Sequence, residues 1–247
     1  MRANYCLLEG RAKMPISRRN FFCGTAATAL SLTATKSMSA NCVMPTQARQ
    51  AAFTPQGAIN ELMEGNARFV SGRPIKCDMH GLVLQTATGQ FPFAAVVSCI
   101  DSRVAAEMVF DQNNGDIFEA RVAGNFVNTD ILGSLEFACR VAGAKAIVVM
   151  GHTECGAIKG AVDQVELGNL TEMLERIEPA VQAAGPVDVR TSIDSEFVQK
   201  VADANVILTV EAINANSSVL ADMVEAGELV IVGAMYDIAT GKVNLIT

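Results

Sequence analysis

Two short polar stretches carry the residues of this chain that can do chemistry. Cys99-Ile-Asp-Ser-Arg103 follows one apolar, β-branched run, and His152-Thr-Glu-Cys155 follows another. Two thiolates and one imidazole are suitable zinc ligands, and a set of three protein ligands leaves the fourth tetrahedral position open for water. The two stretches together therefore predict a catalytic zinc site in a hydrolase or hydratase.

The elements that position these residues alternate between strand and helix patterns. Buried strands are expected at about 93–99, 116–121, 145–150 and 229–235, and a short final strand at 243–246. Helices are expected at 54–72, 103–110, 130–142, from about 155, 170–183 and within 195–226. Residues 73–92 have no clear period and are expected to form a loop, with a short helix around 79–88 as the alternative. This alternation predicts an α/β fold, with a mainly parallel four-stranded sheet, a C-terminal antiparallel edge strand and helices on both faces. Both polar stretches then fall where parallel strands end, which is where ligand sites form in such sheets.

Length and charge limit the class of protein. The chain has 247 residues, half of them apolar, which suffices for one sizeable core, and no segment resembles a linker. We expect a single domain over 41–247 behind a leader at 1–40. Residues 1–39 hold six basic side chains and one acidic one, so the remainder carries 13 basic and 25 acidic side chains. An acidic body argues against nucleic acid or anionic lipid as a partner.

The leader has the pattern of an export signal. Ser17-Arg-Arg-Asn-Phe-Phe22 precedes a weakly apolar run at 23–35, and small residues follow at 37–40. The apolar run is too short and too polar to span a bilayer stably. Its paired arginines resemble the twin-arginine type of signal, which predicts a periplasmic or thylakoid-lumen protein. A disordered N-terminus with a chance Arg-Arg pair is the alternative.

Cysteines outside the two polar stretches have simpler interpretations. Cys139 lies in an apolar helical pattern and is expected to be a buried core residue. Cys42 and Cys77 either pair in an oxidising compartment or remain free thiols.

Several segments, in order along the chain, resemble the β-class carbonic anhydrases. The similarity covers roughly residues 54–247. It rests on Gly65-Asn66-Ala67-Arg68-Phe69, Gly89-Gln90-x-Pro92, Cys99-x-Asp101-Ser102-Arg103-Val104, Arg121-x-Ala123-Gly124-Asn125, Ser134-Leu135-Glu136-Phe137-Ala138, Gly151-His152-x-x-Cys155-Gly156-Ala157 and Gly233-Ala234-x-Tyr236-Asp237. The resemblance implies zinc-dependent, reversible hydration of carbon dioxide to bicarbonate and a proton.

The resemblance also implies the roles of the central residues. Cys99, His152 and Cys155 would bind Zn²⁺, which would lower the pKa of a coordinated water towards ~7. Asp101 and Arg103 would form a catalytic gate. Held by Arg103, the Asp101 carboxylate would orient the zinc-bound hydroxide; released, it would become the fourth zinc ligand and close the site. An ordinary surface ion pair is the alternative for these two residues.

A substrate pocket is implied in the same way. Gln90 matches a glutamine that donates to the bound substrate, while its alternative is an exposed loop amide. Positions that line the carbon dioxide pocket match Phe118, Ala123 and Phe137, and Gly156 falls in the segment after the last zinc ligand. His80, the only histidine besides His152, is either a proton carrier or a solvent-facing bystander.

Two other functions remain open at this stage. The same scaffold could hydrolyse carbonyl sulfide or carbon disulfide, or the chain could be a zinc-binding or redox-sensing homologue without turnover. The expected partners are a small-molecule substrate (carbon dioxide or bicarbonate) and further copies of the chain in a homodimer or higher homo-oligomer, with no nucleic acid and no stable membrane span.

Overall fold

One five-stranded sheet forms the centre of residues 42–246, the part of the chain that the computed structural model describes; the predicted export signal lies outside this part. Its strands are β1 (Ala94–Ser98), β2 (Ile117–Arg121), β3 (Ala146–His152), β4 (Val230–Tyr236) and β5 (Val243–Leu245), in the order β2-β1-β3-β4-β5. The first four pair in parallel, and β5 runs antiparallel to β4. The predicted sheet is confirmed.

Side chains of the central strands are buried on both faces. All five residues of β1 and all seven of β3 are buried. Along β1, Ala95 and Val97 join one apolar core, while Ala94 and Val96 join the other. This two-residue alternation explains why the strands read as continuous apolar runs, as expected when helices cover both faces of a parallel sheet.

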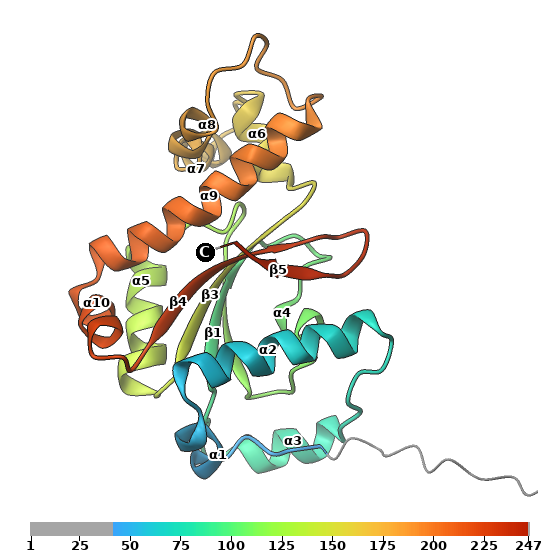
Figure 1. Ribbon diagram of the computed structural model, residues 1–247, viewed down its shortest axis with the longest axis vertical. Helices are drawn as coiled ribbons and strands as arrows, with labels where there is room; N and C mark the ends of the chain where they lie inside the picture. Colours follow the sequence, from blue (N-terminus) through green and yellow to red (C-terminus); the bar gives the residue numbers. More distant parts are fainter. Residues whose placement is uncertain (1–41, 247) are drawn as a thin grey trace, which may run out of the picture. The chain divides into compact units, whose positions relative to one another are not determined.

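Helices cover the two faces of the sheet (Figure 1). The core on one face includes residues of α2 (Pro55–Val70) and α4 (Ala106–Val109). The other face packs against α5 (Thr129–Glu136), the π-helix Phe137–Val141, α6 (Gly156–Val162), α7 (Asn169–Glu175), α8 (Glu178–Ala183), α9 (Ser195–Asn216) and α10 (Ser218–Glu225). Within the described residues, no helix has both the length and the apolar character that crossing a membrane requires.

Two predicted helices have different boundaries from those expected. The helix expected from residue 103 begins only at Ala106, because a turn precedes it in which the Val104 amide donates to the Asp101 carbonyl at 3.0 Å. The helix expected over 170–183 is divided into α7 and α8. Pro179 lies in the first turn of α8, and a proline inside a continuous helix would remove a hydrogen bond and clash with the preceding turn.

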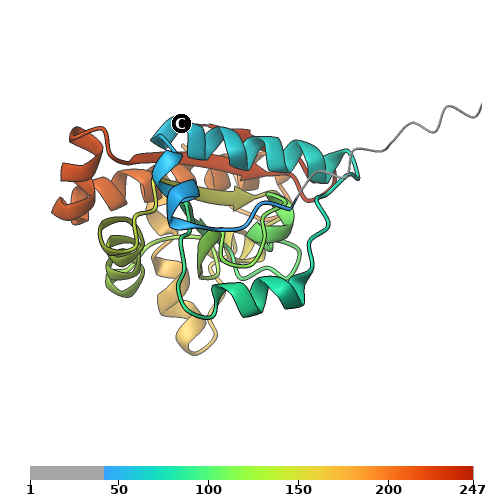
Figure 2. The same cartoon turned by 90° about the horizontal axis from the view of Figure 1, so that it is seen from below.

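Two helices near the start of the described residues lie at the end of the sheet where the strands begin. There α1 (Gln47–Ala52), which the sequence analysis missed, and α3 (Met79–Thr86) lie below the sheet in Figure 1 and in the foreground of Figure 2. The Gln50 amide donates to the carbonyls of Pro92 and Ala142 at 2.6 and 2.7 Å. A disulfide joins Cys42 to Cys77, with 5.4 Å between their Cα atoms. The segment before α1 is thereby tied to the segment before α3.

Candidate metal centre

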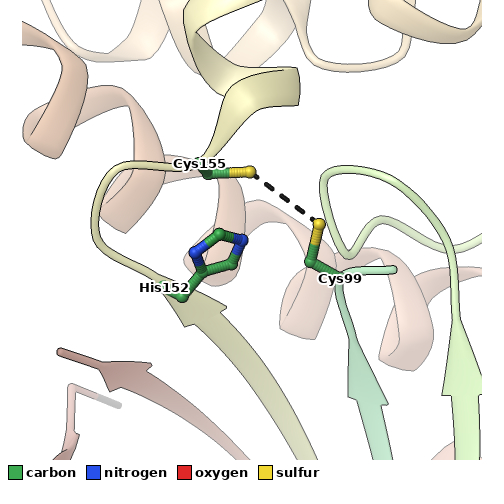
Figure 3. A group of neighbouring side chains, drawn as sticks. All are labelled: Cys99, His152 and Cys155. Carbon is green, nitrogen blue, oxygen red and sulfur yellow. Dashed lines mark hydrogen bonds between the residues drawn. The ribbon is translucent and has the colours of Figure 1, made fainter. Parts of the chain in front are cut away.

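Three predicted ligand residues meet at the carboxyl end of the sheet (Figure 3). Cys99 directly follows β1, His152 is the last residue of β3, and Cys155 caps the N-terminus of α6. Because β1 and β3 are paired in parallel, with Ser98 opposite Met150, their ends lie side by side. One ligand atom from each of the three buried residues lies within 4.8 Å of the other two.

The histidine ring is oriented for metal binding. Nδ1 of His152 lies 2.9 Å from the Thr153 carbonyl oxygen. Since a carbonyl only accepts, Nδ1 carries the proton and Nε2 presents a lone pair. Nε2 is buried and has no hydrogen-bond partner, which is costly unless another group, such as a metal ion, satisfies it.

The two sulfur atoms also suit a cation. Their separation is 4.0 Å, a hydrogen-bond contact in which either sulfur can be the donor. The hydrogen bond with Cys155, and then the Gly124 amide, lower the pKa of the Cys99 thiol, although burial opposes them. The pair thus readily holds one negative charge between its sulfurs. Two thiolates and one imidazole form the Cys2His set of a catalytic zinc site, so these residues fit Zn²⁺.

Two backbone contacts support Cys99 from the neighbouring strand. Arg121, at the end of β2, donates from Nε to the Cys99 carbonyl at 3.0 Å and from Nη2 to the Asp101 carbonyl at 2.8 Å. The Gly124 amide lies 3.4 Å from the Cys99 sulfur. No role for Arg121 was evident from the sequence. A guanidinium at the end of a strand beside the ligand-bearing one is a signal that could have found it.

Asp101 lies beside the three ligand residues and is bound by Arg103. The guanidinium donates to both carboxylate oxygens, from Nε at 2.9 Å and from Nη2 at 2.7 Å. These hydrogen bonds keep the pKa of Asp101 well below its usual range. Oδ2 of Asp101 is 4.0 Å from Nε2 of His152. The carboxylate is therefore ionised, held by Arg103 and close to where a metal ion would bind.

The predicted substrate residues fall into two groups. Gly156 follows Cys155 as the first residue of α6, and Ala123 adjoins Gly124 on the loop over Cys99. The others, Gln90, Phe118 and Phe137, have no described contact with the ligand residues. Phe118 is paired with Ala95, four residues before Cys99, and the groove that the two phenylalanines line includes none of the three ligand residues. Gln90 is exposed and lies before β1, whereas Cys99 lies directly after β1. The length of this five-residue strand alone places Gln90 and Cys99 about 13 Å apart.

Phe118 and Phe137 contact each other away from the ligands. Their ring centroids are 6.3 Å apart, with an edge-to-face geometry. Both rings line an open groove of about 500 Å³ between β2 and α5. His80 is an exposed residue of α3, at the end of the sheet opposite to the ligands.

Comparison with known proteins identifies the family. A sequence model described as carbonic anhydrase matches residues 94–243. The chain belongs to the carbonic anhydrase family. Carbonic anhydrase 2 of Mycobacterium tuberculosis is 39% identical over 199 residues, which cover 77% of this chain and 92% of that protein. A carbonic anhydrase of Mycolicibacterium smegmatis is 36% identical over 198 residues, covering 77% and 93%.

Solved structures show the same fold in β-class members of the family. The β-carbonic anhydrase CcaA aligns with a TM-score of 0.61 at 22% identity, over 76% of this chain and 95% of that one. CafA, a β-carbonic anhydrase of Aspergillus fumigatus, aligns with a TM-score of 0.58 at 26% identity, over 77% and 89%. The fold of this family member is therefore that of the β class, as the sequence motifs predicted.

Two carboxyl groups interact near Arg121: that of Glu119, two residues earlier on β2, and that of Glu107 on α4. The Glu119 side chain accepts a hydrogen bond from the Ala106 amide at the start of α4. Burial and the neighbouring Glu107 carboxyl together raise the pKa of Glu119 to about 7, although the Ala106 amide and the Arg121 charge oppose them. Glu119 thus holds a proton near neutral pH, close to the strand end that supports the candidate centre.

We expect Glu119 to make stability fall as the pH rises. The folded chain keeps this proton up to about pH 7, whereas the unfolded chain loses it near pH ~4.3. The free energy of unfolding should therefore decrease between these values. Urea unfolding across this range should show a shallower decrease for Glu119→Gln than for the wild type. Glu64→Gln, which changes an exposed carboxylate on α2, is the control, and parallel curves for wild type and Glu119→Gln would refute the expectation.

Proposed function

We propose that this chain catalyses the reversible hydration of carbon dioxide to bicarbonate and a proton, with Zn²⁺ held by Cys99, His152 and Cys155. One observation carries this proposal. The three buried ligand atoms lie within 4.8 Å of one another at the carboxyl ends of β1 and β3. Beside them, the Asp101 carboxylate is held by Arg103. A passive zinc-binding protein would not need the second feature.

A zinc ion with these ligands supplies a nucleophilic oxygen near neutral pH, because it lowers the pKa of water towards ~7. The residues of the chain orient and protect that chemistry. Arg103 keeps Asp101 ionised, so the carboxylate would accept a hydrogen bond from the attacking oxygen and orient it. In the described structure Arg103 holds Asp101 with two hydrogen bonds. This arrangement favours the open form of the gate, in which Asp101 is not a ligand.

Carbon dioxide is favoured over its sulfur analogues as the substrate. The curated relatives described above are named carbonic anhydrases, and the Asp101–Arg103 pair is present. Carbonyl sulfide and carbon disulfide are linear molecules that the same nucleophile could attack. Kinetics on the three gases, side by side, distinguish these activities.

Turnover should require the ion and its ligands. Stopped-flow measurements should show rapid carbon dioxide hydration that stops when a chelator removes zinc and returns when zinc is restored. Cys155→Ala should lose stoichiometric zinc and fall to the background rate. Asp101→Asn should keep zinc but lose roughly 10²–10⁴-fold in kcat.

Cys139 offers a matched control for loss of a thiol. It is buried in the core, and burial raises its pKa to about 12, so Cys139→Ala should keep both zinc and turnover. Hydration at the wild-type rate by chelator-treated protein that contains no zinc would contradict the proposed function.

A second copy of the chain is proposed to complete the site. Gln90, Phe118 and Phe137 cannot line a pocket at the metal centre of their own chain as it is folded. The edge strand β2 and the half-exposed Phe137 border the groove of about 500 Å³. A two-fold symmetric contact across this edge would bring the three residues of one copy to the metal centre of the other. A structurally similar chain comes from one of two β-carbonic anhydrases of Sordaria macrospora that are described as tetrameric, which supports an assembly of this kind.

Mixing two inactive variants tests the shared site. Gln90→Ala should impair the site that receives Gln90, and Cys155→Ala should disable the site of its own chain. If the residues come from different copies, subunit exchange in a 1:1 mixture should restore about a quarter of wild-type activity, because half of the dimers are hybrids with one intact site. Activity no greater than the average of the separate variants would refute the sharing.

Export through a twin-arginine signal is proposed for residues 1–40. The basic, apolar and small-residue segments of the leader support it. The Cys42–Cys77 disulfide supports it as well, since disulfides persist in oxidising compartments. A route that carries folded proteins would let the thiolates bind zinc before they meet oxidants, and bound zinc would then protect them.

Replacing Arg18 and Arg19 by lysine should retain the protein in the cytoplasm of a bacterial host with this export route. Cell fractionation and thiol labelling should find wild type outside the cytoplasm with Cys42 and Cys77 oxidised, and the variant inside with both reduced. Loss of this disulfide, which spans 35 residues, should lower the free energy of unfolding by about 3–4 kcal/mol. Arg11→Lys is the control, and equal export of the double variant would exclude this signal type.

A further inference from the structure

The peptide groups of Gly124 connect the sulfur of Cys99 to the long helix α9. The amide of Gly124 lies 3.4 Å from the Cys99 sulfur and donates to it. The carbonyl of the same residue accepts a hydrogen bond of 2.7 Å from Nδ2 of Asn205. Asn205 lies near the middle of α9 and is 3% exposed. Gly124 thus links the Cys99 sulfur to the side chain of Asn205, which lies 81 positions after Gly124 in the sequence.

Asn205 is an unusual residue at its position. It lies on the buried face of α9 with Val201, Ala202 and Val206. Burying an amide costs about 1–3 kcal/mol unless it is hydrogen-bonded, so an apolar residue would be the ordinary choice there. The Gly124 carbonyl is the partner that offsets this cost. An asparagine at position 205 therefore indicates that its contact with the Gly124 carbonyl is needed.

Gly124 itself requires support from its surroundings. Its φ of +83° is a conformation that favours glycine, and a Cβ at this position would lie 2.6 Å from Cδ1 of Ile177. The loop turns tightly here, since the Asn125 amide donates to the Val122 carbonyl at 3.0 Å. The direction of the Gly124 amide depends on how this turn is held. Asn205 fixes the carbonyl of the peptide group that follows the Gly124 Cα.

We propose that Asn205 is a positioning residue for the metal centre. By holding the Gly124 carbonyl, it keeps the Gly124 amide directed at the Cys99 sulfur. An amide that donates to a thiolate stabilises the negative charge and fixes the ligand's orientation. This inference rests on the zinc site of the proposed function. Asn205 touches neither metal nor substrate, and it acts only through Gly124.

Zinc binding and an optical signal test this role. Purified holoprotein is mixed with a chromophoric chelator, and the zinc affinity and release rate are measured. Asn205→Leu, which removes the donor, and Asn205→Asp, which keeps the size but directs a carboxylate at a carbonyl, should weaken zinc binding about 10–100-fold. The cobalt-substituted variants should show a shifted sulfur-to-cobalt charge-transfer band, because the environment of the Cys99 sulfur has changed.

Thr209→Val is the matched control. Thr209 is a buried polar residue one turn further along α9 and is 4% exposed, but no described contact joins it to Gly124. Urea unfolding of each variant separates lost stability from lost positioning. Thr209→Val should leave the zinc affinity and the cobalt spectrum unchanged. If Asn205→Leu does not fold, Asn205→Ser replaces it, because serine shortens the side chain without adding an apolar group.

The outcomes separate the two proposals. Wild-type zinc affinity and an unshifted cobalt band in folded Asn205 variants would overturn the positioning role and leave the proposed function intact. A wild-type protein that binds no zinc would overturn the proposed function and this inference with it. Weaker zinc binding with a shifted band in the Asn205 variants, but not in Thr209→Val, would support both.

Discussion

The parallel pairing of β1 with β3 is the constraint on which the metal centre depends. Ser98 lies opposite Met150, so Cys99 and His152 leave the sheet at neighbouring strand ends. A register shift by one residue would turn the β1 side chains to the opposite face. Cys99 would then leave the core that it shares with Cys155. The two apolar cores therefore stabilise the fold and also set the positions of the ligand residues.

The centre departs from the usual rules of a protein interior. Nε2 of His152 is buried without a partner, and two sulfur atoms lie together where charge is poorly solvated. Such features cost free energy in a metal-free chain. They are explained if a cation binds there, since a metal ion satisfies the imidazole and both thiolates at once. The contacts from Arg121 and Gly124 then hold the ligand-bearing loop in the geometry that the ion requires.

Within one chain, the candidate metal ligands and the predicted substrate-binding residues lie at different places. The ligands and Asp101 lie at the carboxyl ends of the strands, whereas Gln90 lies before β1. Phe118 and Phe137 line an open groove beside the edge strand. An edge strand and an apolar groove are surfaces that a soluble protein tends to cover. Self-association would cover this surface and complete the pocket, so the proposed assembly accounts for both observations.

Local patterns in the sequence predicted most of the fold. Buried strands in a parallel sheet have long apolar runs, and α2 has a threonine cap followed by proline. Such signals are recognised within a few residues. Cys99, His152 and Cys155 were predicted as ligands because their residue types are specific for zinc and each follows a recognisable strand. The boundaries of α4 and α7 were less accurate, because a turn at Asp101 delays the start of α4 and Pro179 begins a separate helix, α8.

The sequence by itself determined the class of fold and the family, and it predicted the three candidate ligand residues that the fold brings together. Only the tertiary structure decided that Cys42 pairs with Cys77, that the Gln50 amide reaches the carbonyls of Pro92 and Ala142, and that Asn205 reaches Gly124. Those facts depend on contacts between residues that are distant along the chain. No local periodicity records such contacts, because they result from how the helices pack on the two faces of the sheet.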